Sequence, residues 1–177
     1  VRSDAEYKRY RVTESGISPR SLPGYGEGVV LVDSDEHTEE GLITESMRVR
    51  DEQNGKRLKK GESIAHEAIP PETLGEGDVA VVGWGSTKHI IQEAIERLKD
   101  ERVRALHFSW VHPLSEAQLA PLRKAGRIIV VENNATGQFA KLLKLHGFTV
   151  HHQILKSDGL AFFVDEKAKW PDEQRDK

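Results

Sequence analysis

The chain has 177 residues, a formal net charge of −3 and no cysteine. Its length suffices for one domain of ordinary size plus an extension. The lack of cysteine excludes disulfides, a thiol nucleophile and cysteine ligation of an iron–sulfur cluster within this chain. Charges of both signs are interspersed and only 6% of the residues are aromatic, which argues against a nucleic-acid partner.

No stretch of the sequence is apolar for long enough to cross a membrane, and no secretion signal opens it. We therefore expect a cytoplasmic protein without a membrane partner. The first residue is Val1 rather than Met, and it opens a charged stretch. This start indicates a piece cut from a longer protein.

Residues 1–75 have an irregular pattern, with turn signals such as Ser18-Pro19-Arg20 and a terminal Pro70-Pro71 pair. Three short elements are predicted here: strands over Tyr7–Val12 and Val29–Val32, and a helix within Thr44–Lys60 that Gly55 would interrupt. Such a segment buries little apolar surface by itself. We therefore expect this irregular extension from an upstream domain to pack against another surface or to stay mobile.

Residues 76–165 alternate between apolar strands and amphipathic helices, and residues 166–177 form a polar tail. The predicted strands are Val79–Val82, Val103–Phe108, Arg127–Glu132, Thr149–Leu155 and Leu160–Val164. A capping box at Ser115–Gln118 opens one helix, and Thr136 can cap the next. This alternation predicts an α/β fold, a three-layer sandwich with a mostly parallel sheet and right-handed crossovers.

The stretch Asp78–Leu98 reads as a buried strand, a glycine turn and an amphipathic helix that Ser86 or Thr87 can cap. The helix would begin at the carboxyl end of a strand, a natural place for an anion. A dinucleotide fingerprint needs a third glycine where Lys88 stands, and the spacing of a P-loop is absent. A tight turn that only allows close helix–strand packing is the structural alternative.

A second candidate region follows the RIIVVE strand, where Glu132 stands beside Asn133 and Asn134. These groups either contact a ligand, or Glu132 caps a helix and binds loop amides. Because parallel strands end at the same edge of a sheet, Gly83–Thr87 and Glu132–Gln138 are predicted to lie side by side. Two helix N-termini would then supply unpaired amides there.

The eight histidines do not have the spacing of a metal site. His151 and His152 are adjacent and would point to opposite faces of a strand, while His107 and His112 are separated by a strand end. No serine lies in a G-x-S-x-G elbow. The sequence therefore gives no catalytic residue and no metal ligand.

Four motifs together resemble the C-terminal region of the alpha subunit of 2-oxoacid:ferredoxin oxidoreductases, most closely the 2-oxoglutarate type. They are YKRYRVTESGISPRSLPG at 7–24, SDEHTEEG at 34–41, VVGWGSTK at 81–88 and VVENNATGQFAKLL at 130–143. The resemblance covers nearly all of residues 7–165. It implies a transketolase C-terminal-like domain, which the HPLSEAQLAPLRKAGRIIVVE run at 112–132 also matches.

The resemblance also implies a function within a larger enzyme. Enzymes of this family oxidatively decarboxylate a 2-oxoacid, pass the acyl group to coenzyme A, and send electrons through thiamine diphosphate and a [4Fe–4S] cluster to ferredoxin. Thiamine diphosphate with its Mg²⁺ lies between an earlier alpha-subunit domain and the beta subunit, which are the implied partners. The chain itself would hold no cofactor, act as a scaffold and interface domain, and be inactive alone.

Two alternatives stay open on the sequence: an autonomous anion- or nucleotide-binding module, and a docking domain without any ligand. The candidate interface or anion contacts are Ser18, Arg20, Gly85, Ser86, Thr87, Glu132, Asn133, Asn134, Thr136, Gly137 and Gln138.

Overall fold

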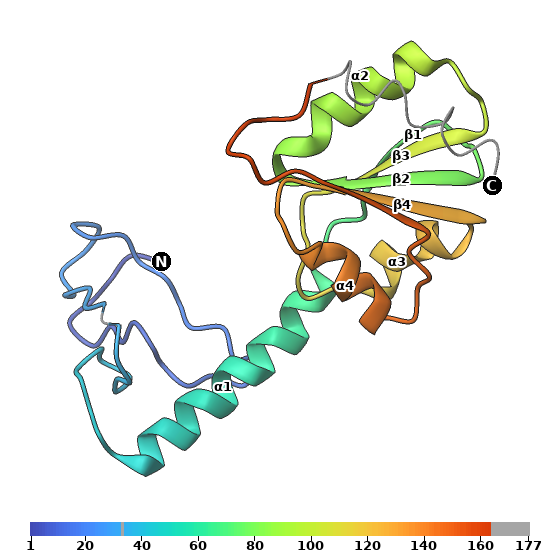
Figure 1. Ribbon diagram of the computed structural model, residues 1–177. Helices are drawn as coiled ribbons and strands as arrows, with labels where there is room; N and C mark the ends of the chain where they lie inside the picture. The colour runs from blue at the N-terminus through green and yellow to red at the C-terminus, as the bar shows by residue number, and fades with distance from the viewer. Residues whose placement is uncertain (33, 164–177) are drawn as a thin grey trace. The chain divides into compact units, whose positions relative to one another are not determined.

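A computed structural model describes residues 1–32 and 34–163. The chain divides into two compact units, Val1–Glu67 and Ala68–Lys177, which are described separately (Figure 1). The sequence places this division near residue 75, several residues later. The predicted polar tail, 166–177, lies outside the described residues.

The second unit contains a five-stranded sheet with the order β1-β3-β2-β4-β5. Its strands are β1 (Glu72–Leu74), β2 (Val79–Trp84), β3 (Val103–Phe108), β4 (Arg127–Glu132) and β5 (His152–Leu155). The pairs β2–β3, β2–β4 and β4–β5 are parallel, and β1 alone runs antiparallel, along β3. The predicted mostly parallel sheet is therefore confirmed.

Helices cover both faces of this sheet. Helix α2 (Lys88–Leu98) lies on one face, and α3 (Glu116–Arg123) and α4 (Gln138–Leu145) lie on the other (Figure 1). Ile91 of α2 belongs to one apolar cluster, while Leu119 of α3 and Leu143 of α4 belong to the other. The sheet thus separates two hydrophobic layers, as the predicted three-layer sandwich requires.

Local sequence signals explain two of these elements. Ser115 caps α3, because its Oγ accepts from the Gln118 amide at 3.3 Å while the Gln118 Oε1 accepts from the Ser115 amide at 3.0 Å. At Gly83 an added Cβ would collide with Ile91 and Thr87. The glycine therefore lets helix α2 pack directly on strand β2.

Some predicted strands differ from the structure. The short strand β1 was not predicted, and β5 begins at His152 rather than at residue 149. Residues 160–163 form no strand, and Val164 lies outside the described residues. The segment has no β partner among the described residues, so its apolar side chains alone do not make it a strand.

The first unit contains one long helix, α1 (Met47–His66), which Ser46 caps. The helix runs uninterrupted through Gly55, so the predicted break there is wrong. The predicted strands Tyr7–Val12 and Val29–Val32 are also wrong. In the described residues of this unit, β structure is limited to two isolated bridges, Ser3↔Gly26 and His37↔Ile43.

Polar groups fill the interior of the first unit. The Tyr10 ring stacks on His37 with ring centroids 3.5 Å apart. The Tyr10 carbonyl accepts from Gln53 Nε2 at 3.1 Å and from Lys56 Nζ at 2.9 Å. Burial, aided by the nearby positive charge of Arg9, lowers the pKa of Lys56. Both clusters of buried apolar side chains, by contrast, belong to the second unit.

Candidate functional site

The two predicted loops lie side by side at the carboxyl edge of the sheet. Strands β2 and β4 are parallel neighbours, and Gly83 pairs with Val131. Trp84 is the last residue of β2, and its indole Nε1 donates to Glu132 Oε2 at 3.2 Å. The predicted juxtaposition of Gly83–Thr87 and Glu132–Gln138 is confirmed.

Glu132 is fully buried, and four donors surround its carboxylate. Besides the Trp84 indole, Oε2 accepts from Asn134 Nδ2 at 2.8 Å and from the Phe139 amide at 2.9 Å. Oε1 accepts from the Ala140 amide at 2.9 Å. A carboxylate at the positive end of a helix is favourably placed, and these bonds compensate its burial. Of the two predicted roles, capping is the one that the geometry supports.

The Asn134 side chain accepts hydrogen bonds from the three backbone amides just before the two that Glu132 binds. Its Oδ1 accepts from Thr136, Gly137 and Gln138 N–H groups at 3.1, 2.7 and 3.4 Å. The predicted cap, Thr136, does not cap α4; Gly137 takes the N-cap position with φ +61°. The amides of 136–140 are therefore occupied, and the expectation of unpaired amides at this helix is wrong.

The glycine turn after β2 is also closed by internal bonds. The buried Thr87 hydroxyl accepts from the Trp84 amide at 3.0 Å and donates to the Trp84 carbonyl at 2.9 Å. Gly85 has φ +58°, and its carbonyl accepts from His107 Nε2 at 3.1 Å. Neither Ser86 nor Thr87 caps α2 with its side chain, which corrects that expectation. Ser86 is exposed at the tip of the turn.

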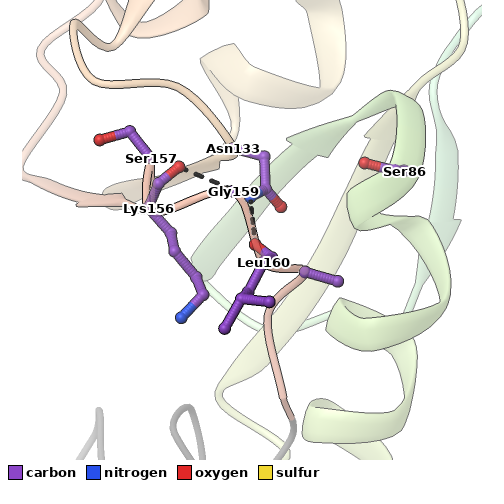
Figure 2. A pocket seen from close by; sticks show the side chains of 7 residues that line it. Ser86, Asn133, Lys156, Ser157, Gly159 and Leu160 are labelled. Atoms are coloured by element: carbon purple, nitrogen blue, oxygen red, sulfur yellow. Dashed lines mark hydrogen bonds between the residues drawn. The ribbon is translucent and has the colours of Figure 1, made fainter.

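A hollow of about 470 Å³ with a mixed polar and apolar lining lies beside this turn (Figure 2). Its lining residues are Ser86, Asn133, Lys156, Ser157, Gly159, Leu160 and Ala161. Asn133 Nδ2 donates to the carbonyls of Leu160 at 3.2 Å and Lys156 at 3.5 Å. Lys156 Nζ lies 2.9 Å from an Asp158 carboxylate oxygen. These contacts hold the segment after β5 against the edge of the sheet.

The other predicted contacts, Ser18 and Arg20, lie in the first unit. Ser18 Oγ donates to the Arg11 carbonyl at 2.9 Å, and the Arg20 carbonyl accepts from the Val1 amino group at 2.6 Å. Within the described residues, no cluster of three or more His, Asp or Glu side chains is suited to hold a metal ion. No described helix is long and apolar enough to cross a membrane.

Sequence reasoning placed Trp84 at this edge only as part of Gly83–Thr87, without a role, and it missed His107. Trp84 is 48 positions from Glu132, so no local spacing links the two. His107 lies near the end of β3, and its Nε2 donates to the Gly85 carbonyl. One signal could have linked Trp84 to Glu132. An indole donor ends one parallel strand, and a carboxylate acceptor ends the neighbouring strand.

The comparisons with known proteins agree on one kind of protein. No protein-family model matches the chain. The alpha subunit of 2-oxoacid:ferredoxin oxidoreductase 2 of Aeropyrum pernix is 39% identical over 177 residues, which is 93% of this chain and 27% of that subunit. The corresponding alpha subunit of Saccharolobus solfataricus is 34% identical over 171 residues, covering 91% of this chain and 27% of its own length.

A solved structure shares the fold of most of the chain. It is the 2-oxoglutarate:ferredoxin oxidoreductase of Magnetococcus marinus, with 2-oxoglutarate, coenzyme A and succinyl-CoA bound. The match has a TM-score of 0.69 and 28% identity, and covers 94% of this chain and 30% of that one. The chain spans about a quarter of the length of the curated relatives it matches. Over nine-tenths of its own length, it is homologous to part of the alpha subunits of 2-oxoacid:ferredoxin oxidoreductases.

Proposed function

We propose that this chain is the C-terminal region of the alpha subunit of a 2-oxoacid:ferredoxin oxidoreductase, and that it serves there as a scaffold and interface domain. The observation that carries the proposal is homology over nine-tenths of this chain to about a quarter of each alpha subunit. A continuous match of that kind is expected of one structural part of a longer subunit.

The geometry of the sheet edge supports a structural role over a reactive one. The Glu132 carboxylate accepts four N–H groups, and the Asn134 amide oxygen accepts three more. A general base or an anion site needs such groups to be available to a ligand. Here they are engaged in joining β2, β4 and α4, which weakens the case for an autonomous anion-binding module.

The proposed enzyme oxidises a 2-oxoacid in the presence of coenzyme A. The carboxylate carbon leaves as CO₂, and the remaining acyl group forms a thioester with coenzyme A, whose thiol proton is released. The two electrons reduce two ferredoxins. Thiamine diphosphate, Mg²⁺ and the [4Fe–4S] cluster would be held by other parts of the enzyme, because this chain has no cysteine to ligate a cluster. We propose a cytoplasmic enzyme whose beta subunit and upstream alpha-subunit domains are the partners of this chain.

We propose 2-oxoglutarate as the substrate. The support is the Magnetococcus marinus enzyme, which shares the fold and contains bound 2-oxoglutarate. The substrate is decided by rates with the assembled enzyme: 2-oxoglutarate is expected to be oxidised faster than pyruvate or 2-oxobutyrate. Faster oxidation of pyruvate would contradict this choice and leave the family proposal intact.

The family proposal is tested by coenzyme A-dependent reduction of a viologen dye. The full-length alpha subunit with its beta subunit is expected to reduce the dye when supplied with a 2-oxoacid. The isolated 177-residue chain is expected to give no reduction under the same conditions. Activity of the isolated chain, or no 2-oxoacid activity of the assembled enzyme, would refute the proposal.

A further inference from the structure

The first unit exposes many large apolar side chains, and several of them lie between Val29 and Met47. The exposed fractions are 73% for Val29, 38% for Leu31, 71% for Val32, 57% for Leu42, 59% for Ile43 and 75% for Met47. Single exposed apolar residues are ordinary, but a cluster of them marks an interaction surface. Neither of the two apolar core clusters contains a residue of this unit.

The segment around Leu31 contacts the segment around Gly41. Gly41 packs against Leu31: a Cβ placed on Gly41 would come within 2.9 Å of the Leu31 Cβ and carbonyl oxygen. Gly41 also has φ +101°, a conformation that favours glycine. The Thr38 amide donates to the Leu42 carbonyl at 2.9 Å and closes the turn that contains Gly41. We call Val29–Val32 with Leu42 and Ile43 the apolar surface.

The segment Val29–Val32 has the side chains of a strand but no β partner among the described residues. Three valines, which favour strands, and one leucine stand here, and none belongs to a strand. Among the described residues, no backbone hydrogen bond involves these four. Exposed N–H and C=O groups beside apolar side chains are the features that allow a segment to add to the edge of a partner sheet.

The charges around the apolar surface restrict its partner. Between Ser21 and Met47 the sequence contains seven acidic residues and no lysine or arginine. Three of them are paired with cations of other segments: Glu36 with Arg57, and Glu39 and Glu40 with Lys8. By its own sequence, this stretch therefore has a net negative charge. A second copy of the chain, or an anionic membrane, would bring like charges together.

We propose that the apolar surface binds a complementary face elsewhere in the same alpha subunit, apolar at its centre and basic at its rim, with Val29–Val32 pairing at the edge of a sheet. The inference rests on the proposed function. It commits to this partner because the relatives place the homologous stretch within a subunit of which it is only 27%. The remaining length supplies the partner within the same polypeptide.

Hydrogen exchange tests the surface directly. The amides of 30–32 are expected to exchange at least tenfold more slowly in the full-length alpha subunit, assembled with its beta subunit, than in the 177-residue chain. The amides of strand β2 serve as an internal reference, because they are paired with β3 and β4 in both samples. Equal exchange of 30–32 in the two samples would overturn the proposal.

Charged substitutions give a second measurement. The double variant Val32→Lys/Ile43→Lys, made in the full-length subunit, is expected to lose that protection at least tenfold, because it puts two cations against an apolar, basic-rimmed face. The matched control is Leu145→Lys, which changes a residue that is 84% exposed in α4 of the second unit. It should leave the exchange of 30–32 unchanged. Retained protection in the double variant would argue against the surface.

The outcomes separate this inference from the proposed function. Protection of 30–32 in a subunit without 2-oxoacid activity would support the surface and refute the enzyme. Full 2-oxoacid activity without protection of 30–32 would support the enzyme and refute the surface. A concentration-dependent dimer of the 177-residue chain, with 30–32 protected in it, would identify a second copy as the partner and overturn the proposal.

Discussion

The two units of this chain are stabilised by different kinds of interior. In the second unit, Leu106, Val130 and Leu143 are fully buried in apolar layers, and each such side chain contributes about 1.5–3 kcal/mol. In the first unit the buried groups include Gln53 and Lys56, which bind a backbone carbonyl. Hydrogen bonds contribute less net stability than apolar burial does. We infer that the second unit is stable by itself and that the first depends on its partner.

Truncating apolar side chains should show the largest difference between the units. Leu143→Ala is expected to lower the free energy of unfolding by about 2–5 kcal/mol, because it leaves a cavity in a closed layer. Val29→Ala is expected to change it by less than about 0.5 kcal/mol, since Val29 is exposed. Urea denaturation of the chain measures both. Similar losses would show that the first unit has an apolar core after all.

Removing the buried carboxylate is the next largest effect. Glu132→Ala leaves the Trp84 indole and the Phe139 and Ala140 amides without their acceptor, and should cost about 3 kcal/mol. Glu132→Gln keeps the volume and one acceptor oxygen, so it is expected to cost less. The comparison uses thermal or urea unfolding of the second unit. Equal stability of Glu132→Ala and the wild type would refute the capping role.

Loss of a helix cap should have a smaller effect. Ser115→Ala removes the hydroxyl that accepts from the Gln118 amide and is expected to cost about 1 kcal/mol. Ser86→Ala is the control, because Ser86 also precedes a helix but gives α2 no side-chain cap. It should be neutral to within about 0.3 kcal/mol. A loss at Ser86 as large as that at Ser115 would mean that its hydroxyl has a partner in solution.

An acid-dependent contribution is expected in the first unit. The Arg57 guanidinium lowers the pKa of Glu36 to about 2. Because the unfolded state binds this proton more readily, the contribution is present above about pH 4.5 and is lost as the pH falls towards 2. The ion pair is partly exposed, so it should contribute less than about 1 kcal/mol.

The pH effect is measured by titrating Glu36 by NMR in the wild type and in Arg57→Met. The variant is expected to restore an ordinary pKa for this carboxyl and to remove the acid-dependent loss. A Glu36 pKa that does not move in Arg57→Met would assign the effect to other groups, such as the His37 amide that also binds this carboxylate.

A small effect on folding is also expected at Gln138. Its side chain is exposed at the start of α4, so Gln138→Ala should change the unfolding free energy by less than about 0.5 kcal/mol. If the sheet edge faces a neighbouring domain or subunit, assembly should weaken by about 1 kcal/mol. Titration of the full-length alpha subunit with the beta subunit measures this. Unchanged assembly would remove the edge from the proposed interface.

The regular part of the fold was predictable because its signals are local. The run at Arg127–Glu132 and the capping box at Ser115 both appear in the structure as the sequence predicts. Strand β1, by contrast, has three residues beside Pro70-Pro71, too few for any periodicity. Its pairing depends on β3, more than thirty positions away.

The candidate site was predictable in position but not in chemistry. Parallel strands place Gly83–Thr87 and Glu132–Gln138 together by topology alone. Whether the amides at the start of α4 are free depends on which side chains reach them. Asn134 accepts hydrogen bonds from three of them. The predicted strand at Val29–Val32 failed for the opposite reason: its side chains favour a strand, but the described residues provide no neighbour for it.

The Glu132 carboxylate has a consequence for how the second unit unfolds. Its four donors come from β2, from its own loop and from the first turn of α4. Release of α4 alone would remove two of the four hydrogen bonds to this carboxylate, which is costly. The carboxylate therefore penalises partly folded states and should make loss of α4 and loss of the sheet edge a single cooperative event.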